Sequence, residues 1–283
     1  DLHLSVDASL QAAAEAALGD ENGTVVALNP STGGVLAMVS LPTFDPNLFV
    51  NGIDQKTYGL LNTSPHRPLY NRVLYGTYPP GSTVKPFMGL AGLEFAAPTA
   101  IKGSWCPGYY SLKGHDHRYR DWKRSGHGKV DGKKAIVESC DVYFYELALD
   151  LGIDRMHHFL TLFGFGSKTG LDLGSESSGL MPSRQWKRAR HKQPWYLGET
   201  LITGIGQGFT LTTPLQLASA TATLATRGLR LQPQLVERIV DRFSGTDHRT
   251  APRIVGQIEL TNPDHWRQVI EAMKGVVHDR TGT

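Results

Sequence analysis

Residues 78–87 read Tyr-Pro-Pro-Gly-Ser-Thr-Val-Lys-Pro-Phe and contain a serine followed three positions later by a lysine. Pro79-Pro80-Gly81 breaks regular structure, and the apolar run Val84–Phe95 predicts a helix that opens at Ser82. Lys85 then lies one turn further on the same face, with its nitrogen within reach of the serine hydroxyl. Because a serine hydroxyl needs such a base to become a nucleophile, the pair predicts nucleophilic catalysis. Taken alone, the pattern also fits an N-cap serine followed by a solvated lysine.

The composition is that of an ordinary globular domain. The chain has 283 residues, of which 40% are hydrophobic and 19% are charged, and this length can bury a sizeable core. A net charge of +3 gives no case for binding nucleic acid on charge alone. No apolar run approaches the ~20 residues of a membrane span, and the opening Asp1-Leu2-His3-Leu4 is not a signal peptide. We expect an excised domain whose targeting segment lies outside this sequence.

Helix and strand signals follow one another in an order that favours a mixed fold. Asp7 and Thr213 are candidate N-caps, and β-branched runs on both sides of Pro30–Gly34 predict a hairpin. Strands near both ends of the chain indicate an α+β fold, an antiparallel sheet flanked by helices with an inserted, mostly helical region. No linker is visible, so residues 1–283 are predicted to form one domain. The expected helices cover residues 8–18, 82–95, about 132–150, 154–163, 214–227 and 263 to about 274, and the expected strands cover residues 24–29 and 35–40. Residues 41–80 are expected to be rich in loops, and residues 103–130 are expected to be polar and irregular.

A second candidate motif, Ser139-Cys140-Asp141, lies at the junction of two predicted helical stretches. Alone, it fits equally a helix-junction serine followed by a capping aspartate. After Ser82-x-x-Lys85, it resembles the second motif of the penicillin-recognising serine enzymes. The resemblance extends over essentially the whole chain, to the transpeptidase domain of the penicillin-binding protein 2 family, the elongation-type, class B enzymes of Gram-negative bacteria. The stretches that carry it are Asp45-Pro-Asn-Leu-Phe49, Asn71-Arg72, Tyr78-Pro-Pro-Gly-Ser-Thr-Val-Lys-Pro86, Arg120-Asp-Trp-Lys123, Gly126-His-Gly128, Pro194-Trp-Tyr196 and Gly204-Ile-Gly-Gln-Gly208.

The resemblance implies a penicillin-binding protein or serine β-lactamase-like fold and an acyl-enzyme mechanism. Ser82 would attack the D-alanyl-D-alanine carbonyl of a peptidoglycan stem peptide, and the amine of a neighbouring stem peptide would then take the acyl group. Uncharged Lys85 would be the base, Ser139 would relay a proton to the leaving amine, and the backbone N–H of Ser82 would supply half of the oxyanion hole. Asp141 stands where this superfamily more commonly has Asn. A carboxylate can accept from a substrate amide or hold a lysine but cannot donate, so the role of Asp141 stays open.

The sequence Arg280-Thr281-Gly282 is similar to the third motif of the family, Lys-(Ser/Thr)-Gly, which lies on a strand that lines the cleft. We reject this assignment, because a strand should precede the motif, whereas Glu271–Lys274 is predicted to be helical. Gly275–Thr283 instead resembles the loop that comes before that strand in the family. We therefore expect the transpeptidase domain to be truncated before its third motif, without the final strands and the other half of the oxyanion hole.

Cys106, Asp121, His127 and Cys140 offer thiolate, carboxylate and imidazole groups suited to zinc. Their spacing is loose, so the bare pattern is weak. The resemblance strengthens it, because some members of the family have a zinc site at these positions, with Asp where Cys106 stands. Four protein ligands would make this zinc structural rather than catalytic. A Cys106–Cys140 disulfide, which an oxidising periplasm favours, and two free thiols are the alternatives left open.

The function that the resemblance implies is a peptidoglycan D,D-transpeptidase that β-lactams acylate. It also implies a periplasmic location, an inner-membrane anchor outside this sequence, and partners in the elongation complex such as a membrane glycosyltransferase. One alternative is a β-lactamase or D,D-carboxypeptidase of the same superfamily, which the long class B match disfavours. The other is a non-catalytic elongation-complex scaffold, which the presence of both Ser82 and Lys85 disfavours.

Overall fold

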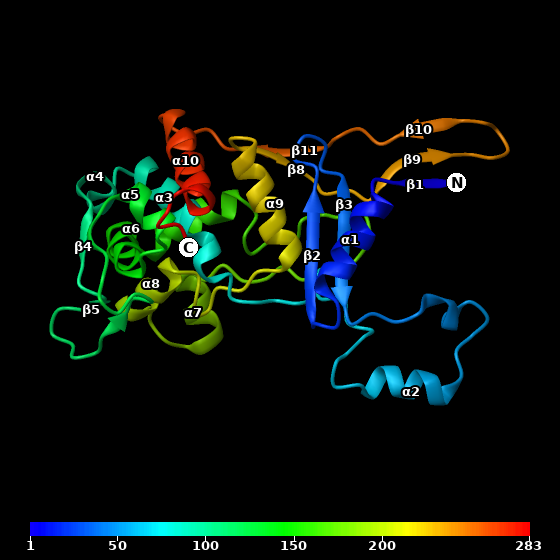
Figure 1. Cartoon of the computed structure of the whole chain (residues 1–283), viewed down its shortest axis with the longest axis horizontal. Helices are drawn as coiled ribbons and strands as arrows, with labels where there is room; N and C mark the ends of the chain where they lie inside the picture. The colour runs from blue at the N-terminus through cyan, green and yellow to red at the C-terminus, as the bar shows by residue number, and fades with distance from the viewer.

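Most helices gather at one end of the long axis of the molecule, and the longest strands lie toward the other end (Figure 1). The computed structural model describes residues 1–283. None of the helices combines the length and apolar character that a membrane span requires. The α-helices are α1 (Ala8–Leu18), α2 (Gln55–Thr63), α3 (Lys85–Glu94), α4 (Pro98–Lys102), α5 (Gly132–Val137), α6 (Asp141–Leu162), α7 (Arg184–His191), α8 (Leu197–Gly204), α9 (Pro214–Ala225) and α10 (Asp264–His278), with 3-10 turns η1 (Pro46–Phe49) and η2 (Gly81–Val84).

Helix α6 is the centre of the helical end, and two glycines bring its neighbours close. A Cβ on Gly92 of α3 would lie 2.7 Å from a methyl carbon of Leu147, and a Cβ on Gly204 of α8 would lie 2.5 Å from the Cβ of Ala148. Only glycine permits such approaches. A core of 33 buried residues surrounds this contact and includes most of the inward side chains of α3, α5, α6 and α10. Each large apolar side chain buried there contributes ~1.5–3 kcal/mol, so the starts of α3 and α6 rest on a rigid base.

The strands form several small antiparallel sheets. A hairpin of two strands packs beside α1, and the six-residue core under it joins Val35 to Leu74, Leu171 and Leu215. The pairs are β2 (Gly23–Leu28) with β3 (Val35–Leu41), β8 (Leu229–Leu231) with β11 (Ile254–Gln257), β4 (Ser104–Cys106) with β7 (Gly128–Val130), and β5 (Tyr109–Tyr110) with β6 (Tyr119–Arg120), while β9 (Val236–Val240) lies between β1 (Leu2–Leu4) and β10 (Asp247–Arg249).

The capped helices and the hairpin lie where the sequence predicts them. The Asp7 carboxylate accepts hydrogen bonds from the N–H groups of Ser9 and Leu10. Thr213 and Gln216 form a capping box at the start of α9. Gly152 interrupts α6 with a φ of 69°, which separates the two helices predicted on either side of it. The α+β class is confirmed, although the strands form several sheets rather than one.

Other parts of the sequence-based picture were wrong. Residues 41–80 contain η1 and α2, and residues 103–130 contain the paired strands β4 to β7 rather than irregular chain. Helix α10 does not end near Lys274 but continues to His278. Strands β4 to β7 have only two or three residues each, so the alternation of apolar and polar residues in them is too short to be recognised in the sequence.

Candidate active site

A cleft of about 530 Å³ opens where the starts of α3 and α6 meet. It brings Ser82 beside Ser139 and Asp141, although the two motifs lie far apart in the chain. Lys85 lies directly beneath, bonded to the second motif. We call Ser82, Lys85, Ser139 and Asp141 the cleft cluster. The residues that line the cleft are Ser82, Arg120, Asp121, Trp122, Ser139, Asp141, Tyr145, Ile205, Gln207 and Thr283.

Ser82 occupies the second position of η2, which runs directly into α3. Its side chain is exposed to the cleft, and its N–H belongs to a first helical turn, where backbone donors lack intrahelical partners. The preceding Gly81 has a φ of 57° and donates from its N–H to the carbonyl of Gly206 at 2.9 Å. A Cβ on Gly206 would collide with the Gly81 carbonyl. The turn that presents Ser82 is therefore fixed against the glycine-rich segment after α8.

Lys85 is 2% exposed and uses its amino group entirely on the second motif. Its Nζ donates to the Ser139 carbonyl at 2.7 Å, to Ser139 Oγ at 3.0 Å and to Asp141 Oδ1 at 2.6 Å. Three partners satisfy the three donors of the group. The sequence predicts the Lys85 nitrogen within reach of the Ser82 hydroxyl, whereas its hydrogen bonds go to Ser139 and Asp141.

Ser139 lies in a left-handed backbone conformation, with a φ of 52°. Its N–H donates to the Ile136 carbonyl at 3.3 Å, and the Cys140 N–H donates to the Ala135 carbonyl at 3.0 Å. Such a conformation costs a non-glycine residue about 1–3 kcal/mol and persists only where the surroundings impose it. Here it joins α5 to α6 in a tight turn that directs the serine hydroxyl at Lys85.

Asp141 begins α6 and holds two groups at once. One carboxylate oxygen accepts from Lys85, and the other accepts from the backbone N–H of Trp122 at 3.1 Å. The Trp122 indole N–H in turn donates to the carbonyl of Glu138 at 3.0 Å. Of the two roles that the sequence left open for Asp141, the one as holder of a lysine is visible in this geometry.

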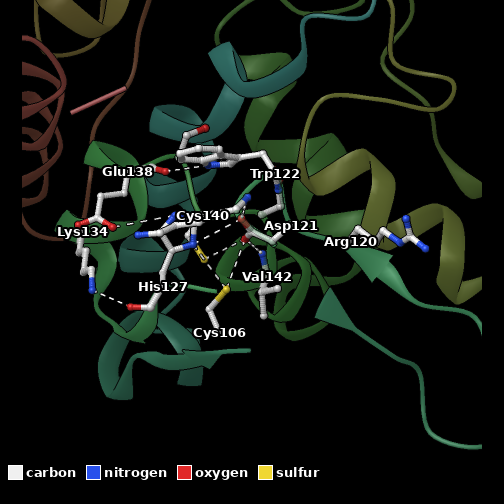
Figure 2. Close-up of polar contacts among 12 residues, drawn as sticks. Cys106, Arg120, Asp121, Trp122, His127, Lys134, Glu138, Cys140 and Val142 are labelled. Atoms are coloured by element: carbon white, nitrogen blue, oxygen red, sulfur yellow. Dashed lines mark hydrogen bonds and ion pairs between the residues drawn. The ribbon is translucent and has the colours of Figure 1, made fainter. Parts of the chain in front are cut away.

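A second group of polar side chains lies behind the same turn, and we call it the thiol cluster. Figure 2 shows Cys106 of β4, Asp121 after β6, His127 before β7 and Cys140 before α6 converging on one point. All four are buried, and their ligand atoms lie within 4.8 Å of one another. Both cysteines are free rather than joined in a disulfide. The Arg120 side chain, by contrast, points away from the cluster.

The spacing of the thiol cluster fits a tetrahedral metal ion. Cys106 Sγ is 3.5 Å from Asp121 Oδ2 and from His127 Nδ1, Cys140 Sγ is 3.4 Å from Asp121 Oδ2, and His127 Nδ1 is 3.4 Å from Asp121 Oδ1. A tetrahedron around zinc, with bonds of ~2.0–2.3 Å, has edges of about 3.3–3.8 Å. The donor set therefore suits zinc in chemistry, and these four separations lie in the tetrahedral range, while the ligand atoms as a whole lie within 4.8 Å of one another.

The electrostatics of the thiol cluster also suit a cation. Burial raises the pKa of the Cys106 thiol and of the Cys140 thiol. Burial opposes the charge on Asp121 as well, but N–H groups of Lys123 and Val142 donate to its carboxylate and His127 lies nearby, so its pKa is lowered. On the far side of the ring, His127 Nε2 has no hydrogen-bond partner and lies 3.9 Å from Glu138 Oε2. A ligating histidine usually donates its other ring N–H to a carboxylate, and Glu138 is the carboxylate that faces this nitrogen, beyond hydrogen-bond distance.

Several residues of the site carried no role in the sequence-based prediction. Trp122, Tyr145 and Gln207 line the cleft, and Trp122 also packs its ring on His127 at 5.6 Å between centroids. The stretches Arg120–Lys123 and Gly204–Gly208 are among those that resemble the penicillin-binding protein 2 family. Only the folded chain shows that they meet at the cleft.

Arg280-Thr281-Gly282 follows α10 and forms no strand. The helix predicted before this segment, at Glu271–Lys274, is confirmed as part of α10. Thr283 nevertheless reaches the edge of the cleft, where its N–H and hydroxyl both donate to the Val137 carbonyl at 3.3 Å. The end of this segment thus contacts α5, the helix that leads into the Ser139 turn.

Comparison with known proteins identifies the family. The family profile "Penicillin binding protein transpeptidase domain" matches residues 23–283. The chain belongs to the family of penicillin-binding protein transpeptidase domains. Among curated relatives, peptidoglycan D,D-transpeptidase MrdA of Acinetobacter baumannii is 45% identical over 283 residues, which cover 100% of this chain and 42% of that relative. This transpeptidase-family chain therefore spans less than half the length of that relative.

Solved structures agree with the family. The crystal structure of Pseudomonas aeruginosa PBP2 in complex with WCK 5153 matches with a TM-score of 0.92 and 50% identity, over 100% of this chain and 60% of that one. The structure of a complex between PBP2 and MreC from Helicobacter pylori matches with a TM-score of 0.89 and 34% identity, over 99% of this chain and 50% of that one. The fold of the penicillin-binding protein transpeptidases is therefore confirmed for this chain.

Proposed function

We propose that this chain is the catalytic part of a peptidoglycan D,D-transpeptidase whose acyl-enzyme forms on Ser82. One observation carries the proposal. A buried lysine is bonded to the serine and carboxylate of the second motif directly beneath a cleft that exposes Ser82. Such a set supplies a nucleophile, a base and a proton relay within one small volume.

The first half of the proposed reaction forms a bond from Ser82 Oγ to the penultimate D-alanine carbonyl of a stem peptide. Lys85, in its uncharged form, takes the serine proton. Ser139 passes its hydroxyl proton to the nitrogen of the terminal D-alanine as the C–N bond breaks, and Lys85 then returns the proton that it holds to Ser139. Asp141 keeps the lysine nitrogen beside Ser139 throughout. The N–H of Ser82 points at the developing oxyanion, where one such donor contributes ~2.7–4 kcal/mol.

The second half transfers the acyl group to the amine of another stem peptide. That amine attacks the ester carbon, the bond to Ser82 Oγ breaks, and the proton lost by the amine returns to the serine through Ser139 and Lys85. Penicillin mimics the first half, because its strained amide also acylates the serine. Because that amide is part of a ring, the nitrogen released on acylation stays attached to the acyl group and cannot diffuse away, so the product blocks the cleft.

The test is a cross-linking reaction with the full-length protein and peptidoglycan strands that carry pentapeptide stems. The proposal expects dimeric, amide-linked stems with release of D-alanine, and little D-alanine released without cross-linking. Release of D-alanine alone would indicate a D,D-carboxypeptidase, and rapid turnover of a chromogenic cephalosporin would indicate a β-lactamase. If the protein reacts with neither the peptidoglycan strands, the cephalosporin nor penicillin, the result would indicate a non-catalytic scaffold.

We further propose that the thiol cluster holds a structural zinc ion. Cys106, Asp121, His127 and Cys140 would fill all four positions, leaving none for water, as in closed structural sites. The ion would supply charge neutralisation and a cross-link between β4, β7 and the start of α6. Since Cys140 lies between Ser139 and Asp141, that cross-link would hold the turn that aims both side chains at Lys85.

Elemental analysis of the full-length protein, purified without chelator, tests the zinc proposal. One zinc per chain is expected, and its loss on conversion of Cys140 to Ser would locate it. Protein without metal, or a Cys106–Cys140 disulfide found by peptide mapping under non-reducing conditions, would overturn the proposal.

We also propose that the whole protein works in the periplasm from an inner-membrane anchor, with partners of the elongation complex. The complex of Helicobacter pylori PBP2 with MreC supports this partnership for a protein that shares the fold. Cross-linking in intact cells, followed by identification of the bound proteins, tests it. Recovery of an elongation-complex protein or a membrane glycosyltransferase is expected, and a protein recovered without either would count against the proposal.

A further inference from the structure

A groove of about 540 Å³ lies beside the catalytic cleft and plays no part in the mechanism above. Aromatic and imidazole rings make up most of its wall, and Tyr196 and Leu197 are 53% and 62% exposed there. Apart from its two histidines, the lining contains no acidic or basic side chain. The lining residues are Leu112, His115, His117, Tyr119, Trp195, Tyr196, Leu197 and Gly198.

The wall of the groove is held in place by packing. The Tyr119 hydroxyl lies so close to Gly198 that a Cβ there would collide with it. The Trp195 indole N–H donates to Thr200 Oγ1 at 2.8 Å. Buried Lys187 lies 4.2 Å from the centre of the Tyr196 ring, and its amino group is paired with Glu199. A cation that covers one face of a tyrosine fixes the ring and leaves its other face to a ligand.

The groove lies next to the wall of the catalytic cleft. Tyr119, which lines the groove, has its ring 5.8 Å from that of Tyr145, which lines the cleft. The Tyr145 hydroxyl donates to the carbonyl of Arg120, the next residue after Tyr119 and another part of the cleft wall. The groove and the cleft are therefore neighbours, with the Tyr119–Tyr145 contact between them.

The chemistry of the groove suits a neutral, polyhydroxylated ring better than a peptide. Exposed aromatic faces attract the slightly positive C–H groups of a sugar ring, and imidazoles of His115 and His117 both donate and accept hydrogen bonds to hydroxyl and acetamido groups. A stem peptide carries carboxylates, for which the lining has no lysine or arginine. In the substrate of the proposed reaction the stem peptide is attached to an amino sugar, so a donor strand that reaches beyond its peptide presents a saccharide to this surface.

From these observations we propose that the groove formed by Tyr119, His117, Trp195 and Tyr196 is a subsite for the glycan portion of the donor strand. The proposal rests on the proposed transpeptidase function and adds the part of the substrate that it recognises. Preference for donors that carry sugar arises in this groove, while acylation of Ser82 by penicillin, which has no sugar, does not depend on it.

The test compares two donors with the full-length protein, a free pentapeptide and the same pentapeptide on its N-acetylated disaccharide. We expect the wild type to use the disaccharide donor with a kcat/KM at least about fivefold higher. His117→Ala and Tyr196→Ala should reduce this ratio to about twofold or less, mainly through KM. Both variants should keep the wild-type rate of penicillin acylation. Tyr58→Ala, which removes an exposed tyrosine from α2, is the matched control and should keep the full ratio.

Two outcomes would overturn the proposal. One is a wild type that uses both donors equally well. The other is a pair of variants that keep the preference for the disaccharide donor, or that lose activity toward both donors to the same extent. Equal loss toward both donors would assign the groove to the peptide. If Tyr196→Ala fails to fold, the exposed His117 still decides the question. Failure of the proposed function looks different, because the wild type would then process neither donor and would not bind penicillin covalently.

Discussion

The cleft cluster and the thiol cluster lie on opposite sides of one short turn, yet their surroundings differ. Ser82 of the cleft cluster is exposed, and the buried lysine beside it is satisfied by Ser139 and Asp141. The four residues of the thiol cluster are all buried, and the cluster has one histidine against a carboxylate and two thiols. An open cluster can exchange substrates, whereas a closed one can only hold its parts together. The contrast assigns chemistry to the first cluster and support to the second.

Trp122 contacts both clusters, one through its backbone and the other through its side chain. Its backbone N–H donates to Asp141, and its ring packs on His127. Residues 139–141 also belong to both, because Cys140 faces the thiol cluster while its two neighbours face the cleft. Changes on the cleft side should therefore affect the reaction directly, and changes on the thiol side should affect it through stability and position.

The largest effect is expected at Lys85. Lys85→Met keeps the buried carbon stem but removes the only base beside Ser139, so the rate of penicillin acylation should fall by about 10²–10⁴-fold. Stopped-flow measurement with a fluorescent penicillin gives this rate. Lys102→Met, which changes an exposed lysine of α4, is the control and should acylate normally. An undiminished rate in Lys85→Met would remove the lysine from the mechanism.

A smaller effect on acylation, but a larger one on stability, is expected at His127. His127→Ala leaves the buried Asp121 without its partner and removes one ligand of the proposed zinc ion, which should cost about 3–5 kcal/mol of unfolding free energy and lower the Tm by roughly 6–20 °C. Acylation at 25 °C should fall by only about tenfold, because Ser139 is misplaced rather than lost.

Chelation of the wild type should reproduce the His127→Ala result, and His248→Ala, at an exposed histidine of β10, should change neither quantity. Differential scanning fluorimetry and the same acylation assay provide the two readings. A variant with wild-type Tm and strongly reduced acylation would mean that the thiol cluster acts in the chemistry, and the contrast between the clusters would be wrong.

The smallest effect is expected at Trp122, where the two clusters meet. Trp122→Phe keeps a ring against His127 but loses the hydrogen bond to the Glu138 carbonyl, a change of about 0.5–1.5 kcal/mol. Acylation should slow by about two- to tenfold, with a small decrease in Tm. Trp105→Phe alters a tryptophan that is 68% exposed on β4 and serves as the control. Equal behaviour of the two variants would show that Trp122 does not link the clusters.

Residues with strong local signals were predictable from the sequence. Ser82 and Lys85 are recognisable because a breaker cluster precedes a long apolar helix, and Thr213 is recognisable because Pro214 follows it at the first helical position. Both clusters contain the residues expected of them. The assignment of the second motif and of the thiol cluster depended on resemblance, since their spacings alone fit ordinary surface residues equally well.

The remaining features depend on tertiary contacts that no local pattern records. A serine gives no sign that it will adopt a φ of 52° at position 139, because the turn between α5 and α6 imposes that conformation. The ion pair between Asp141 and Lys85 and the position of Trp122 between the clusters form only when α3, α6 and the β6–β7 segment pack together. Short strands such as β5 and helices such as α7 have too few residues for a periodic pattern.

The most direct test of the account is a mass spectrum of the full-length protein after incubation with penicillin G. We predict one penicilloyl adduct per chain, located by peptide mapping at Ser82, absent from Ser82→Ala and present in Thr83→Ala, which removes the neighbouring hydroxyl. An adduct on any other residue, or one that persists at full yield in Ser82→Ala, would contradict the assignment of Ser82 as the nucleophile and the mechanism built on it.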